Sequence, residues 1–377
     1  MIRSFRYHLF LNQQELAGLD EIRVKCQRLY NAALEQRISA YRKQEKTVSR
    51  YEQHKELTEL RQSDPEGYGS IAAVILRSPL NRLDRAYKAF FRRIKQGQRP
   101  GFPRFRSRDR YDSFSFPNPV LKGDLLTVPS FGTVRLKLYR PLKGKPLEAH
   151  IRKTCRGWEA SVVCDLGAAP EKLEIKIATG IDVGLTSFAT FSDGSEVENP
   201  RFFRRSEALL AKHQKALASK KKRRNSNSRK RSKLLVAKTH LHIRNQRLDF
   251  LRKLAKEIVS KYDLVAIEDL NIRGMVRTLN FGKSVSDASW GLFAACLSNK
   301  AEEAGKTIVA VDPRGTSQNC SGCGKRVVKL LSERQHRCPH CGLSLGRDHN
   351  AALNIHALGL SAVSRTGAKA PMLAEAS

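Results

Sequence analysis

Residues 179–185 read TGIDVGL, so that one acid, Asp182, stands inside an apolar run flanked by glycines. The surrounding pattern predicts a strand over residues 175–182, a second over 187–191, and a turn at 193–194 that leads into a third. A lone carboxylate in a buried strand is costly unless it is paired or holds a metal. The stretch therefore predicts a sheet that carries a functional acid.

The downstream segments alternate between helical and strand patterns. A long basic helical stretch comes first, with Leu251 and Ile258 on its apolar face. Residues 264–267 and 307–311 are short apolar runs typical of buried strands, and residues 347–358 are again helical in pattern. Three strands, then helix, strand, helix, strand and helix, is the order expected of an RNase H-like domain. The predicted fold class is therefore a multidomain α/β protein with an RNase H-like core.

Two further acids occupy comparable positions. Glu268 ends the second buried strand, and Asp348 opens the last helical segment. Because the strands of Asp182 and Glu268 are predicted neighbours in the sheet, the two acids suggest a shared cation site. Asp348 alone could be a helix N-cap. Together the three acids supply what a two-metal phosphodiesterase needs, which is hard oxygen ligands for two Mg²⁺ ions, with Mn²⁺ as a substitute, about 4 Å apart.

Four of the eight cysteines are clustered in two Cys-x-x-Cys pairs, namely Cys320, Cys323, Cys338 and Cys341. Two such pairs about fifteen residues apart predict one tetrahedral zinc ion with Zn–S distances of roughly 2.3 Å. Gly322 and Gly342 are expected to permit the tight turns, and His336 and His340 are not needed as ligands. Four thiolates leave no open coordination position, so the zinc is predicted to be structural.

The chain is strongly basic. Lys and Arg number 70 against 36 Asp and Glu, which gives a net charge of +34. Such a charge favours a polyanionic partner, and nucleic acid fits because each neutralised phosphate releases a counterion. A membrane surface would call for an amphipathic anchor or a lipidation site, and the sequence shows neither. The start of the chain lacks the apolar core of a signal peptide, so a cytoplasmic location is expected.

A run of cations between two helical segments is expected to face phosphates. Its members are Lys220, Lys221, Lys222, Arg223, Arg224, Arg229, Lys230 and Arg231. The alternative is a solvated helix pair with a loop at residues 225–228.

The N-terminal half has two patterns. Residues 12–107 are predicted to be helical, and one apolar face recurs from Leu80 to Ile94 until the sequence GFP at 101–103 breaks it. Residues 108–172 alternate apolar and polar positions, with a hairpin turn expected at 156–157, and predict a β-rich module.

Several motifs occur in one order along the chain: GIDVG (180–184), IEDL (267–270), TSQNCSGC (316–323), CPHCG (338–342) and RDHNAALN (347–354). That order resembles the TnpB family of insertion sequences, the OrfB proteins once called transposases. The segment GFPRFR (101–106) resembles the N-terminal signature of that family, so the resemblance covers nearly the whole chain.

The resemblance implies an RNA-guided DNA endonuclease related to the type V CRISPR effectors. The guide RNA would come from the right end of the transposon, and the protein would read a short transposon-adjacent motif in double-stranded DNA while guide pairing reads the rest. One monomer per guide RNA is favoured. The implied domains are a β-rich wedge (1–11 and 108–172), a helical recognition domain (12–107), a RuvC-like nuclease (173–319 and 346–360), a zinc ribbon that contacts target nucleic acid (320–345) and a disordered tail (361–377).

The resemblance also assigns residues. Asp182, Glu268 and Asp348 match the catalytic positions of the family, and Arg347 and Asn350 would support them. The residues that fall where the family touches the adjacent motif are Arg50, His54, Val74, Arg77 and Ser78. Two other functions remain open, a guided DNA-binding repressor without cleavage and a guide-independent transposase or resolvase. The intact acids count against the repressor.

Overall fold

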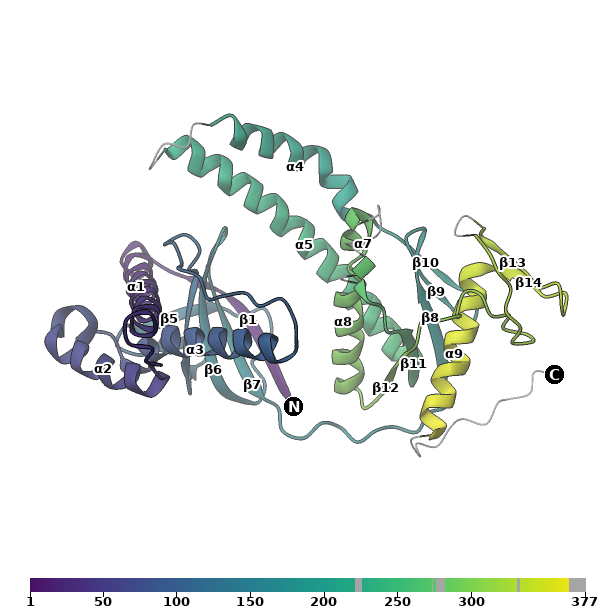
Figure 1. Ribbon diagram of the computed structural model, residues 1–377, viewed down its shortest axis with the longest axis horizontal. Helices are drawn as coiled ribbons and strands as arrows, with labels where there is room; N and C mark the ends of the chain where they lie inside the picture. The colour runs from purple at the N-terminus through teal and green to yellow at the C-terminus, as the bar shows by residue number, and fades with distance from the viewer. Residues whose placement is uncertain (221–225, 273, 276–281, 331–332, 366–377) are drawn as a thin grey trace. The chain divides into compact units, whose positions relative to one another are not determined.

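The computed structural model describes residues 1–220, 226–272, 274–275, 282–330 and 333–365 (Figure 1). The chain forms two compact units, Met1–Ala168 and Ala169–Ser377. Among the described residues, no helix is long and apolar enough to cross a membrane.

The first unit contains a seven-stranded antiparallel sheet in the order β2-β6-β7-β1-β5-β4-β3. Its strands are β1 (Ile2–Phe10), β2 (Ser113–Pro117), β3 (Val120–Lys122), β4 (Leu125–Val128), β5 (Gly132–Lys137), β6 (Lys145–Thr154) and β7 (Gly157–Asp165). The N-terminal strand lies inside the sheet, because β1 pairs with both β5 and β7. The predicted hairpin joins β6 to β7, and Gly157 adopts the positive φ of 115° that the turn requires.

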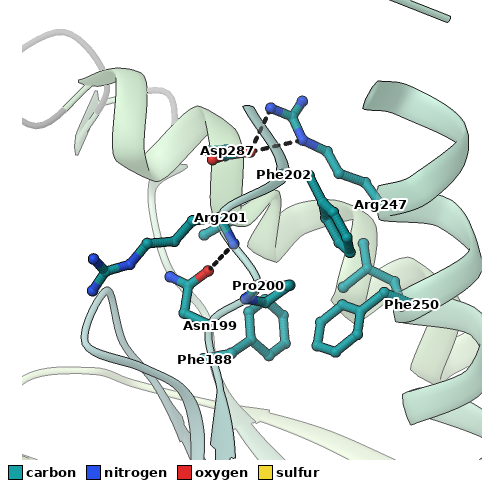
Figure 2. Close-up of a pocket in the computed structure, with 10 residues that line it drawn as sticks. Phe188, Asn199, Pro200, Arg201, Phe202, Arg247, Phe250 and Asp287 are labelled. Atoms are coloured by element: carbon teal, nitrogen blue, oxygen red, sulfur yellow. Dashed lines mark hydrogen bonds and ion pairs between the residues drawn. The ribbon is translucent and has the colours of Figure 1, made fainter. Parts of the chain in front are cut away.

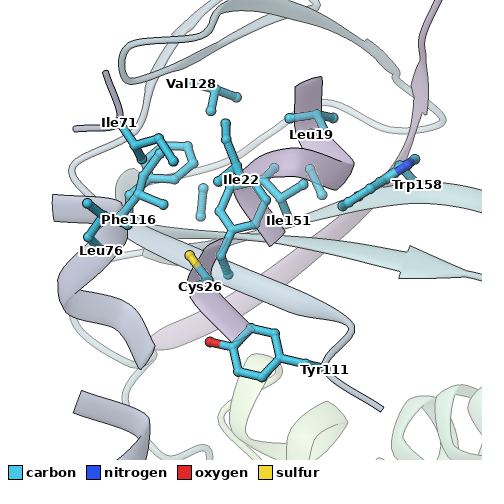
Figure 3. Packing of buried hydrophobic residues seen from close by; sticks show 14 of the residues in the cluster. Leu19, Ile22, Cys26, Ile71, Leu76, Tyr111, Phe116, Val128, Ile151 and Trp158 are labelled. Atoms are coloured by element: carbon cyan, nitrogen blue, oxygen red, sulfur yellow. The ribbon is translucent and has the colours of Figure 1, made fainter. Parts of the chain in front are cut away.

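Three helices accompany this sheet: α1 (Gln13–Gln44), α2 (Arg50–Ser63) and α3 (Ala73–Lys95), with a short π-helical turn, η1 (Pro65–Gly69), between the last two. Apolar side chains of α1, α3 and the sheet form one core, in which Leu19, Leu76 and Ile151 are buried (Figure 3). The predicted face of α3 is buried at Leu80 and Leu83. Ile94, however, is 49% exposed, because the core does not extend to the last turns of this helix.

The second unit contains a five-stranded sheet in the order β10-β9-β8-β11-β12. The strands are β8 (Ala178–Val183), β9 (Ser187–Phe191), β10 (Glu196–Glu198), β11 (Leu264–Glu268) and β12 (Thr307–Val311). β8, β9 and β10 form an antiparallel meander, and β11 runs parallel to both β8 and β12. The strands expected from the sequence are present, but β8 spans Ala178–Val183 and not 175–182, and β11 ends at Glu268, one residue later than expected.

Helices cover both faces of this sheet. α5 (Asn227–Lys261), α7 (Gly282–Ala288) and α8 (Trp290–Glu303) pack on one face and α9 (Arg347–Arg365) on the other, whereas α4 (Phe202–Ala218) packs on α5. Val265 and Ile267 of β11 pack in the cluster formed with α5 and α8, whereas Leu264 and Ala266 pack on the α9 side. The alternation of side chains along a strand thus separates the two layers.

Close packing of α9 on the sheet explains a glycine in the opening motif. A Cβ at Gly180 would lie 2.3 Å from the backbone oxygen of Ala352 in α9, so only glycine permits this approach. The helix extends to Arg365, whereas a disordered tail was expected from residue 361. Residues 366–377 lie outside the described residues. A two-stranded antiparallel sheet, β13 (Gln335–Arg337) and β14 (Ser344–Gly346), precedes α9.

Candidate active site and metal centre

Three elements bring the predicted acids to one face of the second sheet. β8 and β11 are hydrogen-bonded parallel neighbours, with Ile181 opposite Ile267, so Asp182 and Glu268 are the next residues of the two strands. Side chains alternate between the two faces of a strand, so Asp182 lies on the same face as Gly180, and Glu268 lies on the same face as Ala266. Gly180 and Ala266 both face α9. The helix itself supplies Asp348 in its first turn. We call Asp182, Glu268 and Asp348 the carboxylate site.

The charges at the carboxylate site are poorly compensated. The pKa of Asp182 is raised to about 8, first by burial and then by the negative charges of Glu268 and Asp348, while Arg347 opposes the shift. Burial also raises the pKa of Glu268, against a lowering effect of the Thr316 hydroxyl. Clustered carboxylates with an excess of negative charge are the donor set that a hard divalent cation requires.

The carboxylates face one another without closing into a compact ligand cluster. In the part of the chain that the structure describes, only the four cysteines bring three or more ligand atoms within 4.8 Å of one another. Glu268 Oε1 accepts a hydrogen bond of 2.6 Å from Thr316 Oγ1, and Asp348 Oδ2 lies 4.0 Å from Arg334. Asp348 also lies inside the first turn of α9, which begins at Arg347, and is therefore not an N-cap.

Thr316 and Asn354 were not predicted as site residues. Thr316 is 2% exposed, and its backbone oxygen accepts a hydrogen bond of 2.8 Å from Asn354 Nδ2 of α9. Asn350, one turn earlier, is fully buried and bonds the backbone of Ser321 and Asn319. The two asparagines thus fasten α9 to the segment that carries both Thr316 and the first cysteine pair. The two asparagines stand four residues apart in RDHNAALN, on one face of the helix, and this spacing was the sequence signal that could have identified Asn354.

The cysteine cluster consists of Cys320, Cys323, Cys338 and Cys341, whose sulfurs all lie within 4.8 Å of one another. The Sγ atoms of Cys320 and Cys341 are 3.5 Å apart, and those of Cys323 and Cys338 are 3.6 Å apart. A tetrahedron with Zn–S bonds of about 2.3 Å has sulfur–sulfur edges of about 3.8 Å, so the spacing fits zinc. The four cysteines therefore have the arrangement of a site that could hold one zinc ion.

Two equivalent turns place these sulfurs. Gly324 N donates to Cys320 O at 2.8 Å, and Gly342 N donates to Cys338 O at 3.0 Å. Both glycines have positive φ, of 73° and 75°, whereas Gly322 does not, so the expected role of Gly322 belongs to Gly324. His336 is buried beside Lys329, and neither it nor the exposed His340 joins the cluster.

The basic run divides into different environments. Lys230 and Arg231 are exposed on α5. Arg229 instead turns back to α4, where its guanidinium donates to the backbone oxygens of Leu217 and Lys220 at 3.2 and 2.9 Å. Such bonds satisfy the open carbonyls at a helix C-terminus, so Arg229 has a structural role in the hairpin. Residues 221–224, also predicted to face phosphates, lie outside the described residues.

The residues expected to touch the adjacent motif lie on α2 and α3. Burial and then the nearby charges of Arg77 and Arg50 lower the pKa of His54. Val74 packs against the core. Ser78 does not fit the expectation, since it is 5% exposed and its hydroxyl accepts a hydrogen bond of 3.1 Å from the Ser115 backbone on β2.

A small pocket lies where α4 begins, and none of the three acids lines it (Figure 2). Asp287 pairs with Arg247 at 2.7 Å (Figure 2). It also accepts a hydrogen bond of 2.9 Å from the Phe203 backbone. An acid at a helix N-terminus is favourable. Asp287 therefore joins α4, α5 and α7 at this pocket, and its position is structural.

Comparisons with known proteins identify the relatives of this chain. Residues 161–279 match the OrfB_IS605 family, described as "Probable transposase", and residues 290–355 match the Cas12f1-like TNB domain. A protein of Streptomyces pristinaespiralis named "Putative RNA-guided DNA endonuclease" is 32% identical over 96% of this chain and 90% of its own length. InsQ of Escherichia coli (strain K12), named in the same way, is 28% identical over 75% of this chain and 74% of its own.

The fold also has a match among solved structures. The protein chain of a solved complex, the Cas12f1-sgRNA-target DNA complex, matches with a TM-score of 0.58 at 15% identity, over 92% of this chain and 83% of that one. The chain is thus a mixed α/β protein related to proteins named as RNA-guided endonucleases. It belongs to the TnpB family, and the resemblance found in the sequence is confirmed.

Proposed function

We propose that this protein is an RNA-guided, Mg²⁺-dependent endonuclease of an insertion sequence. It cuts double-stranded DNA beside a short transposon-adjacent motif, with a single RuvC-like site formed by Asp182, Glu268 and Asp348. The observation that carries the proposal is the convergence of these acids on one face of the sheet, where two of them raise the pKa of the third. The strand order with β11 parallel to β8 is the one expected of an RNase H-like core.

The chain contributes ligands and positioning to this reaction. Asp182, Glu268 and Asp348 would hold the divalent cations, and Thr316 orients Glu268 through the hydrogen bond of 2.6 Å. When bound, Mg²⁺ offsets the negative charge that develops on the attacking and leaving oxygens of the phosphodiester. Arg347, whose charge opposes the raised pKa of Asp182, limits the repulsion among the acids. The carboxylate ligands fit magnesium better than a softer metal.

The cysteine cluster holds a structural zinc ion in this proposal. All four ligand positions are thiolates, so no position is left for water or substrate. The four cysteines would hold the ion and so order the segment between β12 and α9, which Asn350 and Asn354 connect to the helix that carries Asp348.

The proposed partners are a guide RNA from the right end of the transposon and a double-stranded DNA target. The net charge of +34 supports nucleic-acid partners, and the similar relatives are named as RNA-guided. We also assign the first unit to the wedge and recognition functions, and the second to the nuclease and zinc ribbon. One monomer per guide RNA is part of the proposal.

Sequencing of the RNA that copurifies with the protein is the first test. One discrete RNA species is expected, and plasmids that match its variable end are expected to be cut when Mg²⁺ is present. A random sample of cellular transcripts would contradict guided recognition and support the resolvase. Guided binding without cleavage in Mg²⁺ or Mn²⁺ would support the repressor.

A further inference from the structure

The C-terminal half of α3 and the segment after it present aromatic side chains to solvent. Four rings are in mutual contact, with centroid distances of 5.2 to 6.3 Å, namely Tyr87, Phe90, Phe91 and Phe102. Phe91 is 53% exposed, Phe102 is 49% exposed, and Phe105 on the same segment is 52% exposed. We call these five residues the aromatic surface. Contiguous exposed apolar groups of this kind mark interaction sites.

The segment with Phe102 and Phe105 is anchored to the rest of the first unit at two points. Pro103 is buried, and the backbone of Arg106 is held by both ends of the Asn31 carboxamide, each at 2.9 Å. The exposure of the two phenylalanines therefore occurs in a fixed segment. Rings held in place lose little entropy when a partner binds them.

The charge around the aromatic surface has one sign. Residues 85–106 contain eight cations and no acid. Five exposed members have no ion-pair partner among the described residues: Arg92, Arg93, Lys95, Arg99 and Arg104. Fixed aromatic rings set among unpaired cations are the features with which proteins bind single-stranded nucleic acid, since the bases stack on rings and the phosphates meet cations.

We propose that the aromatic surface stacks unpaired bases of the guide RNA. The inference deepens the proposed function and rests on it, because the guide is the nucleic acid that the protein would hold continuously. Burial of exposed apolar groups is favourable, so a partner that stays bound keeps them out of water. Unpaired bases are also the part of an RNA that can leave its own stack and lie on a protein ring.

A tryptophan reporter tests stacking directly. The two native tryptophans, Trp158 and Trp290, are 3% and 6% exposed, so Phe91→Trp places an exposed indole in the full-length protein. A 20-nucleotide uridine RNA is expected to quench the added emission by at least about twofold, because bases stack on the ring. An abasic RNA of the same length carries the same phosphates and is expected to leave the emission unchanged.

The matched control is Tyr41→Trp, at a residue of α1 that is 65% exposed and lies outside the aromatic surface. It is expected to respond to neither RNA. Equal quenching of Phe91→Trp by the uridine and abasic RNAs would overturn the proposal, as would no quenching by either. Quenching by single-stranded DNA but not by RNA would also overturn it and assign the surface to a DNA strand.

Affinity provides a second readout. The double variant Phe91→Ala, Phe105→Ala is expected to bind the uridine RNA at least about tenfold more weakly, with an unchanged dependence of log K on log salt. Arg92→Gln is expected to reduce that salt slope by up to about 1. Unchanged affinity of the double variant would contradict the proposal. Because these measurements need no DNA cleavage, a protein that stacks RNA but never cuts would refute the proposed function alone.

Discussion

The cysteine cluster and the carboxylate site are both sets of side chains that can bind metal, but they differ in how closely their ligand atoms lie together. Four sulfurs already lie within 4.8 Å of one another, whereas the three acids, also among the described residues, form no such cluster. The cysteines come from two similar turns between residues 320 and 341. The acids come from two strands and a helix that span residues 182 to 348.

Charge explains the difference. The glycine turns fix the cysteines locally, and, against the effect of desolvation, hydrogen bonds from the backbone of His340 and Cys341 lower the pKa of Cys338 to about 6, which favours its thiolate. At the carboxylate site, burial and then the negative charges of Glu268 and Asp348 raise the pKa of Asp182 to about 8, because the acids repel one another. The comparison shows that local turns place the cysteine ligands, whereas the packing of two strands and a helix places the carboxylate ligands.

The largest effect is expected from substitutions that remove an acid of the carboxylate site. Asp182→Ala, Glu268→Gln and Asp348→Ala should each lower the cleavage rate by at least about 10³-fold, roughly 4 kcal/mol of transition-state stabilisation, because each removes a metal ligand. Binding of guide and target should persist, since it depends on base pairing and cations. Gel shifts and plasmid cleavage on the same preparations measure both, with Asp249→Ala on α5 as a control acid. Cleavage by Asp182→Ala at the wild-type rate would refute the catalytic role.

The next largest effect is expected from loss of a ligand in the cysteine cluster. Cys338→Ser should lose the zinc ion and expose residues 316–346 to protease, because metal binding supplies folding free energy to such ribbons. Cleavage should fall by roughly 10²-fold, an order of magnitude typical for loss of ordered site geometry. Elemental analysis and limited proteolysis provide the readouts, with Cys155→Ser as a control outside the cluster. Freshly purified protein without zinc would show that the assignment is wrong.

A smaller effect concerns the link between the two sites. Thr316→Val removes the hydroxyl that bonds Glu268 and should weaken Mn²⁺ binding and cleavage by roughly tenfold, the worth of about one charge-assisted hydrogen bond. Thr316→Ser keeps the hydroxyl and should restore both. Titration of Mn²⁺ by electron paramagnetic resonance separates metal affinity from activity. Equal behaviour of the two variants would make Thr316 a packing residue only.

The smallest effect is the pH dependence of stability. The folded-state pKa of Asp182, about 8, lies above the usual value of about 3.9, so the folded protein binds the extra proton between these pH values. The contribution of Asp182 to stability is therefore complete at low pH and is lost as the pH rises towards 8. Asp182→Asn should raise the melting temperature on the order of 5 °C at pH 8.5 in magnesium-free buffer, and less at pH 5. A difference that grows towards low pH would contradict the sign.

Local patterns account for what the sequence predicted well. β9 and β12 begin and end at the expected residues, because each is a short continuous apolar run. The turn at Gly194 follows β9 directly. The pairing of Asp182 and Glu268 followed from two buried strands that each contain an acid. The four cysteines needed only their spacing. In each case the deciding residues are close in sequence or repeat one pattern.

Tertiary contacts account for the rest. Thr316 reaches Glu268 across 48 residues, and no local pattern records that bond. Ile94 continues an apolar helical face beyond the end of the core, so periodicity alone predicted burial that the packing does not provide. Ser78 faces β2 for the same kind of reason, since its hydroxyl meets Ser115 of a distant strand.

The central claim is that Asp182, Glu268 and Asp348 form one metal site. X-ray diffraction at the manganese absorption edge, from crystals of the RNA-bound protein grown with Mn²⁺ in place of Mg²⁺, tests it most directly. The account predicts anomalous density about 2.1 Å from oxygens of all three carboxylates, and none from manganese at the cysteine cluster. Protein that cleaves its guided target in Mn²⁺ yet shows no manganese between these acids would contradict the account.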